Sequence, residues 1–198
     1  QRIGDIMSST SREQLERWLS NIDVIGRILD IGGSANGLKN RVKSFNPKKY
    51  LIMDNNAEKG WHEKWQEPDI KESIESFGSP KIAKYKNYFN QIYMIEVSEY
   101  LINPLIAITN VYFMLKKGGK FYSSYHMCYP KHNPESKDFL RYTDWGIKKL
   151  HEIAGFKDIK ITPRMAENDL AGFYSAERMR GIKGIDHNVI GYMCEAIK

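Results

Sequence analysis

Cysteine is scarce in this sequence, since Cys128 and Cys194 are the only two among 198 residues. They stand far apart, without the paired spacing that holds zinc or builds a disulfide framework. No cluster of histidine, cysteine or carboxylate residues has the spacing of a metal site. These absences predict two unpaired thiols and a reaction that needs no metal ion.

Long hydrophobic runs are also missing, because no apolar stretch approaches the roughly 18 residues that a membrane-spanning helix needs. The first ten residues lack the charged, then apolar, then small pattern of a secretory signal. We therefore expect no membrane span and a cytoplasmic location. A chain of 198 residues buries one full core but is short for two, which predicts a single domain.

Acidic residues are fewer than basic ones, which gives a formal charge of +6 and a pI near 9.1. Such a balance permits an anionic partner, for example nucleic acid or a phosphorylated sugar. The lysines are dispersed, however, and pairs such as Lys48-Lys49 and Lys116-Lys117 stand next to turns. A solvated surface explains them more simply.

Predicted strands and helices alternate along most of the chain. Short apolar runs predict strands, and apolar residues repeated every three or four positions predict helices. The predicted strands are 27–31, 50–53, 91–95, 120–125, 156–161 and 189–197, with a further short strand at 69–73 or 81–85; the predicted helices are 12–20, 38–45, 105–115 and 143–154. The alternation predicts a doubly wound α/β fold, a mainly parallel sheet between layers of helices.

Three acids stand at predicted strand ends: Asp30, Asp54 and Glu96. In an open parallel sheet, ligands bind beyond the carboxyl ends of the strands, where the strand order reverses. The glycine-bearing loop 32–37 follows the first strand, but it has neither the G-x-G-x-x-G spacing of a dinucleotide site nor the Lys-Ser/Thr of a phosphate loop. A glycine loop beside an acid that can accept hydrogen bonds from a ribose diol favours a nucleoside ligand with little phosphate.

Four ordered motifs resemble those of class I S-adenosylmethionine-dependent methyltransferases, in particular the type 11 and type 12 groups. Residues 28–37 (ILDIGGSANG) resemble motif I, Asp54 follows at the distance of motif II, residues 95–104 (IEVSEYLINP) are similar to an "EVLEH-I-x-x-P" stretch, and residues 115–121 (LKKGGKF) are similar to an "LKPGG" turn. Residues 129–156 resemble an "H-x-P…D-Y-x-R-Y-T…AGF" run of glycan and small-metabolite methyltransferases. The likeness covers about residues 12–162.

This resemblance implies a Rossmann-like sheet of seven strands with the last strand antiparallel and helices on both faces. Within one domain, 1–198, it implies a leading helix (11–25), a cofactor-binding half (27–125) and a substrate-side half (126–198). The implied cofactor is S-adenosyl-L-methionine.

The resemblance also implies roles for particular residues. Asp30 would orient the loop and the methionine amino group, Asp54 would hold the ribose hydroxyls, and Glu96 would face the methionine end. An acid near the third strand, Glu72 or Asp69, would contact adenine. The full set of expected cofactor residues is Asp30, Gly32, Gly33, Ser34, Asn36, Gly37, Asp54, Asn55, Glu72 and Glu96. Ser34 and Asn36 make the loop bulkier than an all-glycine one.

Methyl transfer from a sulfonium is an in-line displacement, so the protein aligns the acceptor and, for a hydroxyl acceptor, removes a proton. Candidate bases are His126, at the end of a predicted strand, and His132 in the following loop, because histidine titrates near neutral pH. A solvated or structural role is the alternative for each. Tyr100 is the third catalytic candidate and stands where relatives often carry histidine.

Glu99, Arg141 and Tyr142 are the expected substrate-binding residues. Arg141 and Tyr142 could clamp an anionic or sugar substrate, or could only cap their loop.

The expected function is methyl transfer to a small polar acceptor, a hydroxyl of a sugar or glycan precursor. A nucleic-acid acceptor is the first alternative, although the strand-end tetrapeptide IEVS is not the N/D-P-P-Y/F type of base-amino methylation. The second alternative is a catalytically silent cofactor-binding subunit. The sequence predicts no oligomeric state.

Overall fold

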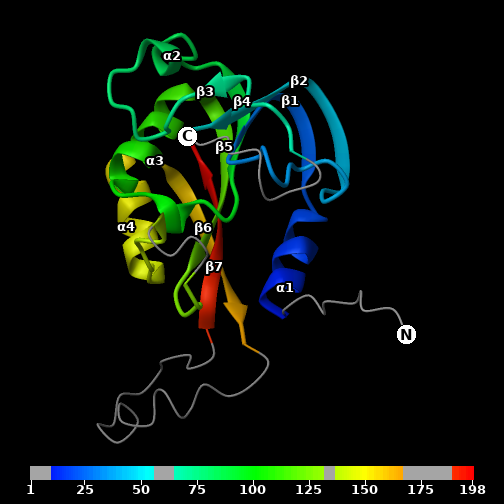
Figure 1. Cartoon of the computed structure of the whole chain (residues 1–198), viewed down its shortest axis with the longest axis vertical. Coiled ribbons are helices and arrows are strands. Elements are labelled where there is room, and N and C mark those ends of the chain that lie inside the picture. The colour runs from blue at the N-terminus through cyan, green and yellow to red at the C-terminus, as the bar shows by residue number, and fades with distance from the viewer. Residues whose placement is uncertain (1–9, 56–64, 132–136, 167–188) are drawn as a thin grey trace, which may run out of the picture.

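The computed structural model describes residues 10–55, 65–131, 137–166 and 189–198. Seven strands within these ranges form one sheet in the order β3-β2-β1-β4-β5-β7-β6 (Figure 1). In chain order the elements are α1 (Thr10–Leu19), β1 (Asp23–Ile31), β2 (Ser44–Asp54), β3 (Ile70–Lys71), α2 (Pro80–Ala83), β4 (Phe89–Met94), the 3₁₀ helix η1 (Ser98–Tyr100), α3 (Pro104–Met114), β5 (Leu115–His126), α4 (Asp144–Ala154), β6 (Lys157–Met165) and β7 (Val189–Ile197).

The strand directions confirm the predicted fold class. β1 pairs in parallel with β2 on one side and with β4 on the other, and β4 pairs in parallel with β5. β7 runs antiparallel to both β5 and β6. The chain moves outward from β1 to β3 and returns to β4, so the strand order reverses between β1 and β4. Ligand sites of such sheets lie at that point, at the carboxyl ends of the strands.

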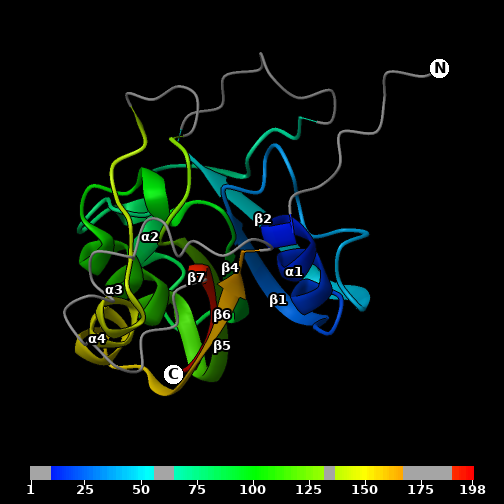
Figure 2. The same ribbon diagram turned by 90° about the horizontal axis from the view of Figure 1, so that it is seen from below.

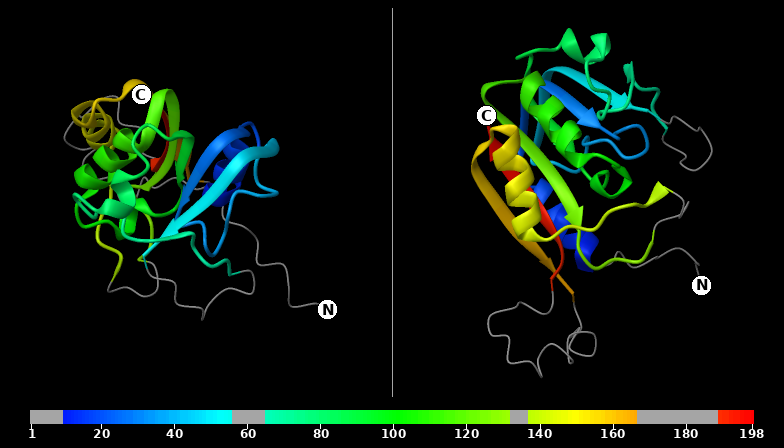
Figure 3. Two further views of the ribbon diagram at one scale, coloured as in Figure 1. Left: turned by 90° about the horizontal axis from the view of Figure 1, so that it is seen from above. Right: turned by 90° about the vertical axis from the view of Figure 1, so that its left-hand side faces the viewer.

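Helices cover both faces of the sheet (Figures 2 and 3). On one face, Leu15 and Leu19 of α1 pack with Ile28 of β1 in a buried apolar cluster. On the other face, α3 and α4 pack over the sheet, with Ile108 of α3 and Ala154 of α4 in a second cluster. Burial of these apolar side chains is the main favourable contribution to folding.

Local signals set the ends of α4, close to its predicted bounds. The Thr143 hydroxyl accepts a hydrogen bond from the Gly146 N–H at 3.1 Å, which satisfies a donor of the first turn. Gly155 ends the helix at φ = 105°, in the left-handed conformation that glycine adopts without steric cost.

The predicted helix over 38–45 is wrong. Residues 38–43 form turns and bends, and β2 already begins at Ser44, which pairs with Asp23 at the start of β1. The connection over 32–43 must therefore return the chain along β1, about 26 Å at 3.3 Å per residue. Eight helical residues would advance it only about 12 Å, and the observed connection instead runs through turns and bends. Pro47 lies within β2 next to a register shift.

The third strand lies in the first of its two predicted places. β3 is two residues long, Ile70–Lys71, and pairs with the end of β2. The alternative at 81–85 is wrong because α2 begins there: the Ser79 hydroxyl accepts from the Lys81 N–H at 3.2 Å, and Pro80 occupies the first turn, where no N–H partner is needed.

Among the described residues, none of the helices has the length and apolar character required to cross a membrane. Cys128 and Cys194 are both free thiols. Within the same ranges, no group of three or more histidine, cysteine or carboxylate side chains is placed to hold a metal ion.

Candidate functional site

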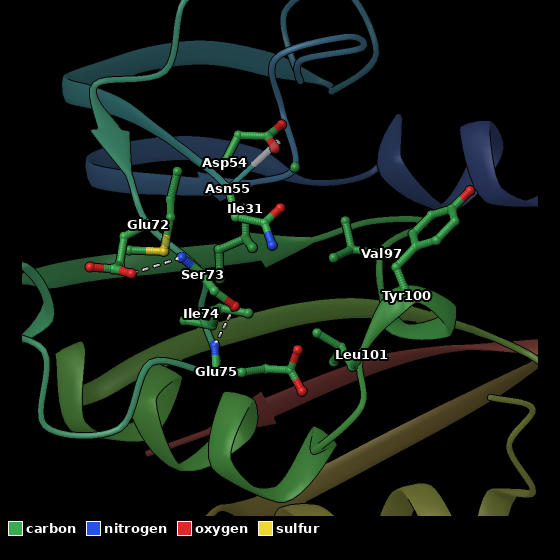
Figure 4. Close-up of a pocket in the computed structure, with 12 residues that line it drawn as sticks. Ile31, Asp54, Asn55, Glu72, Ser73, Ile74, Glu75, Val97, Tyr100 and Leu101 are labelled. Carbon is green, nitrogen blue, oxygen red and sulfur yellow. Dashed lines mark hydrogen bonds between the residues drawn. The ribbon is translucent and has the colours of Figure 1, made fainter. Parts of the chain in front are cut away.

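A pocket opens at the carboxyl ends of β1 and β2, as the topology predicts. Figure 4 shows three walls: the ends of β1 and β2, the segment after β3, and the segment around η1. The residues that line it are Ile31, Gly32, Met53, Asp54, Asn55, Glu72, Ser73, Ile74, Glu75, Val97, Tyr100 and Leu101. Apolar side chains therefore share the pocket with several polar groups, among them the carboxylates of Asp54, Glu72 and Glu75, and such a combination can bind a small molecule.

Gly32 and Asp54 bring two strand ends together at this pocket. The Gly32 N–H donates to the Met53 carbonyl at 2.8 Å, which holds the start of the loop against β2. Gly32 has φ = 77°, and a Cβ atom there would lie 2.4 Å from Cγ2 of Val97. A side chain at this position would therefore be strained and would fill the pocket wall.

The two acids expected near the third strand have different surroundings. Glu72 lines the pocket, and its carboxylate accepts from the Ser76 hydroxyl at 2.6 Å and the Ser79 hydroxyl at 2.9 Å. These hydrogen bonds lower the pKa of Glu72. Asp69 instead accepts from the Ile52 N–H at 2.8 Å and so supports the edge of β2. Of the two, Glu72 is the one that reaches the pocket.

Asp30 lies beneath the glycine loop rather than in the pocket wall. Its side chain is buried, and the Tyr50 hydroxyl of β2 donates a hydrogen bond to Oδ2. Burial raises the pKa of Asp30 to about 7, although the Tyr50 hydrogen bond and Arg41 oppose the rise. A Cβ atom at Gly33 would lie 2.5 Å from Cγ of Asp30, so the loop backbone passes directly over this carboxyl.

The remaining loop residues do not line the pocket, and contacts with neighbouring segments hold them in place. Ser34 is buried, and its carbonyl accepts from the Gln66 N–H at 2.8 Å. The Asn36 carbonyl accepts from Nη1 of Arg41 at 2.8 Å. A Cβ atom at Gly37 would lie 3.1 Å from the Tyr50 hydroxyl.

Four charged side chains meet beside the ends of β4 and β5; we name Glu96, Glu99, His126 and Arg164 the ion-pair cluster. Nε2 of His126 lies 3.2 Å from Glu96 Oε2 and 3.4 Å from Glu99 Oε1. Nη1 of Arg164 donates to Glu96 Oε1 at 2.8 Å. The side chains of His126 and Glu99 are fully buried and that of Arg164 is 1% exposed. The expected methionine-end residue, Glu96, is thus held by two cationic partners.

The backbone at Glu96 is strained, because this non-glycine residue has φ = 56°. The Ser124 hydroxyl accepts from the Glu96 N–H at 2.8 Å and donates to Oε1 of the same residue at 2.9 Å. Such conformations persist where surrounding contacts fix them, and they concentrate at functional sites.

The electrostatics of the ion-pair cluster favour its charged form. Burial alone would lower the pKa of His126, but the contacts with Glu96 and Glu99 outweigh it and raise the pKa to about 9. Burial would raise the pKa of Glu96, but His126 and Arg164 hold it well below its ordinary value. At neutral pH His126 is therefore protonated. It would have to release that proton before it could act as the general base expected from the sequence.

Tyr100 lines the pocket one residue after Glu99 of the ion-pair cluster, so η1 connects the two regions. Burial and nearby Glu99 raise the pKa of Tyr100 to about 12. His132, the other expected base, lies outside the described residues.

Arg141 makes contacts within its own loop, whereas Tyr142 contacts η1. Nη2 of Arg141 donates to Asp138 Oδ2 at 2.8 Å and to the Tyr129 carbonyl at 3.2 Å. The buried Tyr142 hydroxyl donates to the Ser98 carbonyl at 2.7 Å. The Arg141 contacts are those of the loop-capping alternative, and Tyr142 attaches the loop to η1.

Sequence reasoning missed Arg164 and the pocket residues Ser73 and Glu75. Arg164 stands 68 positions after Glu96 in the chain, and its Nε also donates to the Ser11 carbonyl at 3.2 Å. Its contact partners depend on the antiparallel end of the sheet, so a local pattern gives no signal. For Ser73 and Glu75 a signal existed, because they directly follow the short third strand at the carboxyl edge.

No protein-family model matches the chain, and no curated protein matches its sequence. Solved structures do resemble it. A SAM-dependent methyltransferase from Archaeoglobus fulgidus superposes with a TM-score of 0.62 at 13% identity, over 96% of this chain and 92% of that one. An S-adenosylmethionine-dependent methyltransferase from Mesorhizobium loti gives a TM-score of 0.59 at 13% identity, over 95% and 98%.

A third similar structure contains a bound cofactor. Phosphoethanolamine N-methyltransferase 2 of Haemonchus contortus, in complex with S-adenosyl-L-methionine, gives a TM-score of 0.54 at 13% identity, over 98% of this chain and 54% of that one. The sheet order, the antiparallel seventh strand and these superpositions lead to one conclusion: the chain has the Rossmann-like fold of the class I S-adenosylmethionine-dependent methyltransferases.

Proposed function

We propose that this protein is an S-adenosylmethionine-dependent methyltransferase that acts on a small polar acceptor. The observation that carries the proposal is the pocket at the carboxyl ends of β1 and β2, where Asp54 stands opposite the apolar wall around Val97. It combines the close backbone approach at Gly32 with a carboxylate suited to a diol.

The pocket residues fit an adenosine group. Asp54 and Asn55 would bind the ribose hydroxyls, and the side chains of Ile31, Ile74 and Leu101 would pack on the base. A side chain at position 32 would be strained and would meet Val97. It would therefore occupy space that we assign to the adenosine group. When bound, the cofactor supplies an electrophilic methyl group on a positively charged sulfur.

The protein's own contribution to transfer is alignment of the acceptor. Tyr100 lines the pocket, and the ion-pair cluster adjoins it through Glu99 of η1, so we place the acceptor beside these polar groups. His126 is fully buried and held as a cation between two carboxylates, so it would position Glu96 beside the acceptor and would not contact the acceptor itself. A hydroxyl of a sugar or glycan precursor is the acceptor class that we propose.

The test uses methyl-labelled S-adenosylmethionine with three acceptor sets: sugars and sugar nucleotides, small amines, and RNA or DNA. Label transfer to a sugar hydroxyl is the expected result. Transfer to amines or nucleic acid would replace the proposed acceptor class but keep the enzyme. Tight binding of S-adenosylhomocysteine with no transfer to any set would support a silent cofactor-binding subunit instead.

A further inference from the structure

The glycine loop of this chain is followed by no helix. Residues 38–43 form turns, and the chain enters β2 at Ser44. A helix after such a loop would order it by successive backbone hydrogen bonds. Other contacts must therefore fix the loop that borders the adenosine pocket.

Tyr50 of β2 makes these contacts from the neighbouring strand. Its hydroxyl donates to Oδ2 of Asp30 below the loop and accepts from the Leu38 N–H, at 3.3 Å, at the end of the loop. The ring packs edge-on against Phe45, with 5.2 Å between centroids, so it is held in position from the side. We name these two hydrogen bonds the Tyr50 bridge.

Glycine is required where the Tyr50 bridge meets the loop. A Cβ atom at Gly33 would overlap the Asp30 carboxyl, and one at Gly37 would lie 3.1 Å from the Tyr50 hydroxyl and 3.5 Å from the Gly33 carbonyl. The loop backbone thus lies tightly against the two bridged side chains. A hydrogen bond to a carboxyl in such a buried place contributes more than one at the surface.

A second contact ties the outer side of the loop to α1. Arg41 donates to both carboxylate oxygens of Glu16 at 2.9 Å and to the Asn36 carbonyl at 2.8 Å. This pair is partly exposed, whereas the Asp30 end of the Tyr50 bridge is buried. The Tyr50 bridge is therefore the inner attachment of the loop.

We propose that Tyr50 is a positioning residue for the cofactor, because it fixes the glycine loop through Asp30 and Leu38 in place of the missing helix. The cofactor part of this inference rests on the proposed function. Tyr50 does not line the pocket and acts only through the loop.

The experiment compares Tyr50→Phe with the wild type and with Tyr93→Phe. Tyr93 is the matched control, since it is a buried tyrosine of β4 and is paired in register with Asp30. The Tyr93 hydroxyl donates to Gln91 at 3.1 Å and does not contact the loop. Two quantities are measured: hydrogen exchange of the loop amides in the free protein, and the affinity for S-adenosylhomocysteine by calorimetry.

In Tyr50→Phe we expect exchange at Leu38 to become about tenfold faster and the affinity to fall about tenfold, while Tyr93→Phe stays near the wild type. Unchanged exchange, or faster exchange with unchanged affinity, would overturn the positioning role. A wild type that binds no S-adenosylhomocysteine overturns the proposed function and the cofactor role with it, whereas the exchange data decide the Tyr50 bridge independently.

Discussion

The pocket at the carboxyl ends of β1 and β2 and the ion-pair cluster are connected through η1 but handle charge differently. The pocket combines apolar side chains with the carboxylates of Asp54, Glu72 and Glu75, at an opening beside the ends of the strands. The ion-pair cluster buries two carboxylates with two cations, so its formal charges balance when His126 is protonated. The comparison indicates that the pocket is arranged to bind a ligand, whereas the ion-pair cluster is arranged to hold its own geometry. Substitutions should therefore affect affinity in the first region and stability in the second.

The largest expected effect comes from Arg164→Leu in the ion-pair cluster. The variant leaves the Glu96 carboxylate without its 2.8 Å partner in a buried place. Removal of one partner of a buried ion pair costs about 3–5 kcal/mol. We expect the free energy of unfolding, measured by urea denaturation at pH 7, to fall by this amount. A loss below about 1 kcal/mol would mean that the cluster behaves like a surface ion pair, and the contrast with the pocket would fail.

A pH series tests His126 in the same cluster. Its folded pKa of about 9 lies above the ordinary 6.5, so its stabilising contribution is complete below pH 6.5 and is lost as the pH rises to 9. We expect the unfolding free energy to fall by up to about 3 kcal/mol across this window. In His126→Gln this decrease of the unfolding free energy should be absent. A decrease of the same size in the variant would mean that other groups cause it.

Asp30→Asn extends the comparison to the buried carboxyl beneath the glycine loop, next to the pocket. The folded pKa of Asp30, about 7, lies above the ordinary 3.8, so the ionised carboxyl costs stability increasingly from pH 4 to pH 7. At pH 8 the variant should be more stable than the wild type by about 1–3 kcal/mol, after the cost of a buried amide. Below pH 4 the gain should vanish. A less stable variant at pH 8 would show that the carboxylate is stabilised by its surroundings.

The smallest effect belongs to Lys120→Met, which removes an ion pair with Glu195 at 2.7 Å. The Lys120 side chain is 43% exposed, so solvent screens the pair. We expect the free energy of unfolding, measured by urea denaturation, to change by less than about 1 kcal/mol. Added salt should make this difference from the wild type smaller still. A loss as large as that of Arg164→Leu would remove burial as the explanation of the difference.

The fold was predictable because its signals are local. Apolar runs located the strands, and Thr143 and Gly155 delimited α4. The failure at 38–45 has a physical reason: Leu38 and Val42 have helical spacing, but both pack in an apolar cluster from a connection of turns and bends. β2 already pairs with β1 from Ser44 onward, inside the predicted helix, and this pairing depends on register, which the pattern does not encode.

The site was predictable where it follows strand ends, as with Gly32 and Asp54, and not where distant segments meet. Glu96 and His126 were identified singly, each at the end of its strand. The raised pKa of His126 depends on Glu96 and also on Glu99 of η1, and Glu96 is held in addition by Arg164 of β6. Tertiary contacts of this kind have no period in the sequence.

The central claim is that the pocket binds an adenosine group through Asp54. Calorimetric titration of S-adenosylhomocysteine into the wild type, Asp54→Asn and Asp23→Asn tests it most directly, because Asp23 is an exposed aspartate at the opposite end of β1. We predict binding to the wild type, at least about tenfold weaker binding to Asp54→Asn, and an affinity within about twofold of the wild type for Asp23→Asn. No binding to the wild type, or equal affinity for all three proteins, would contradict the account.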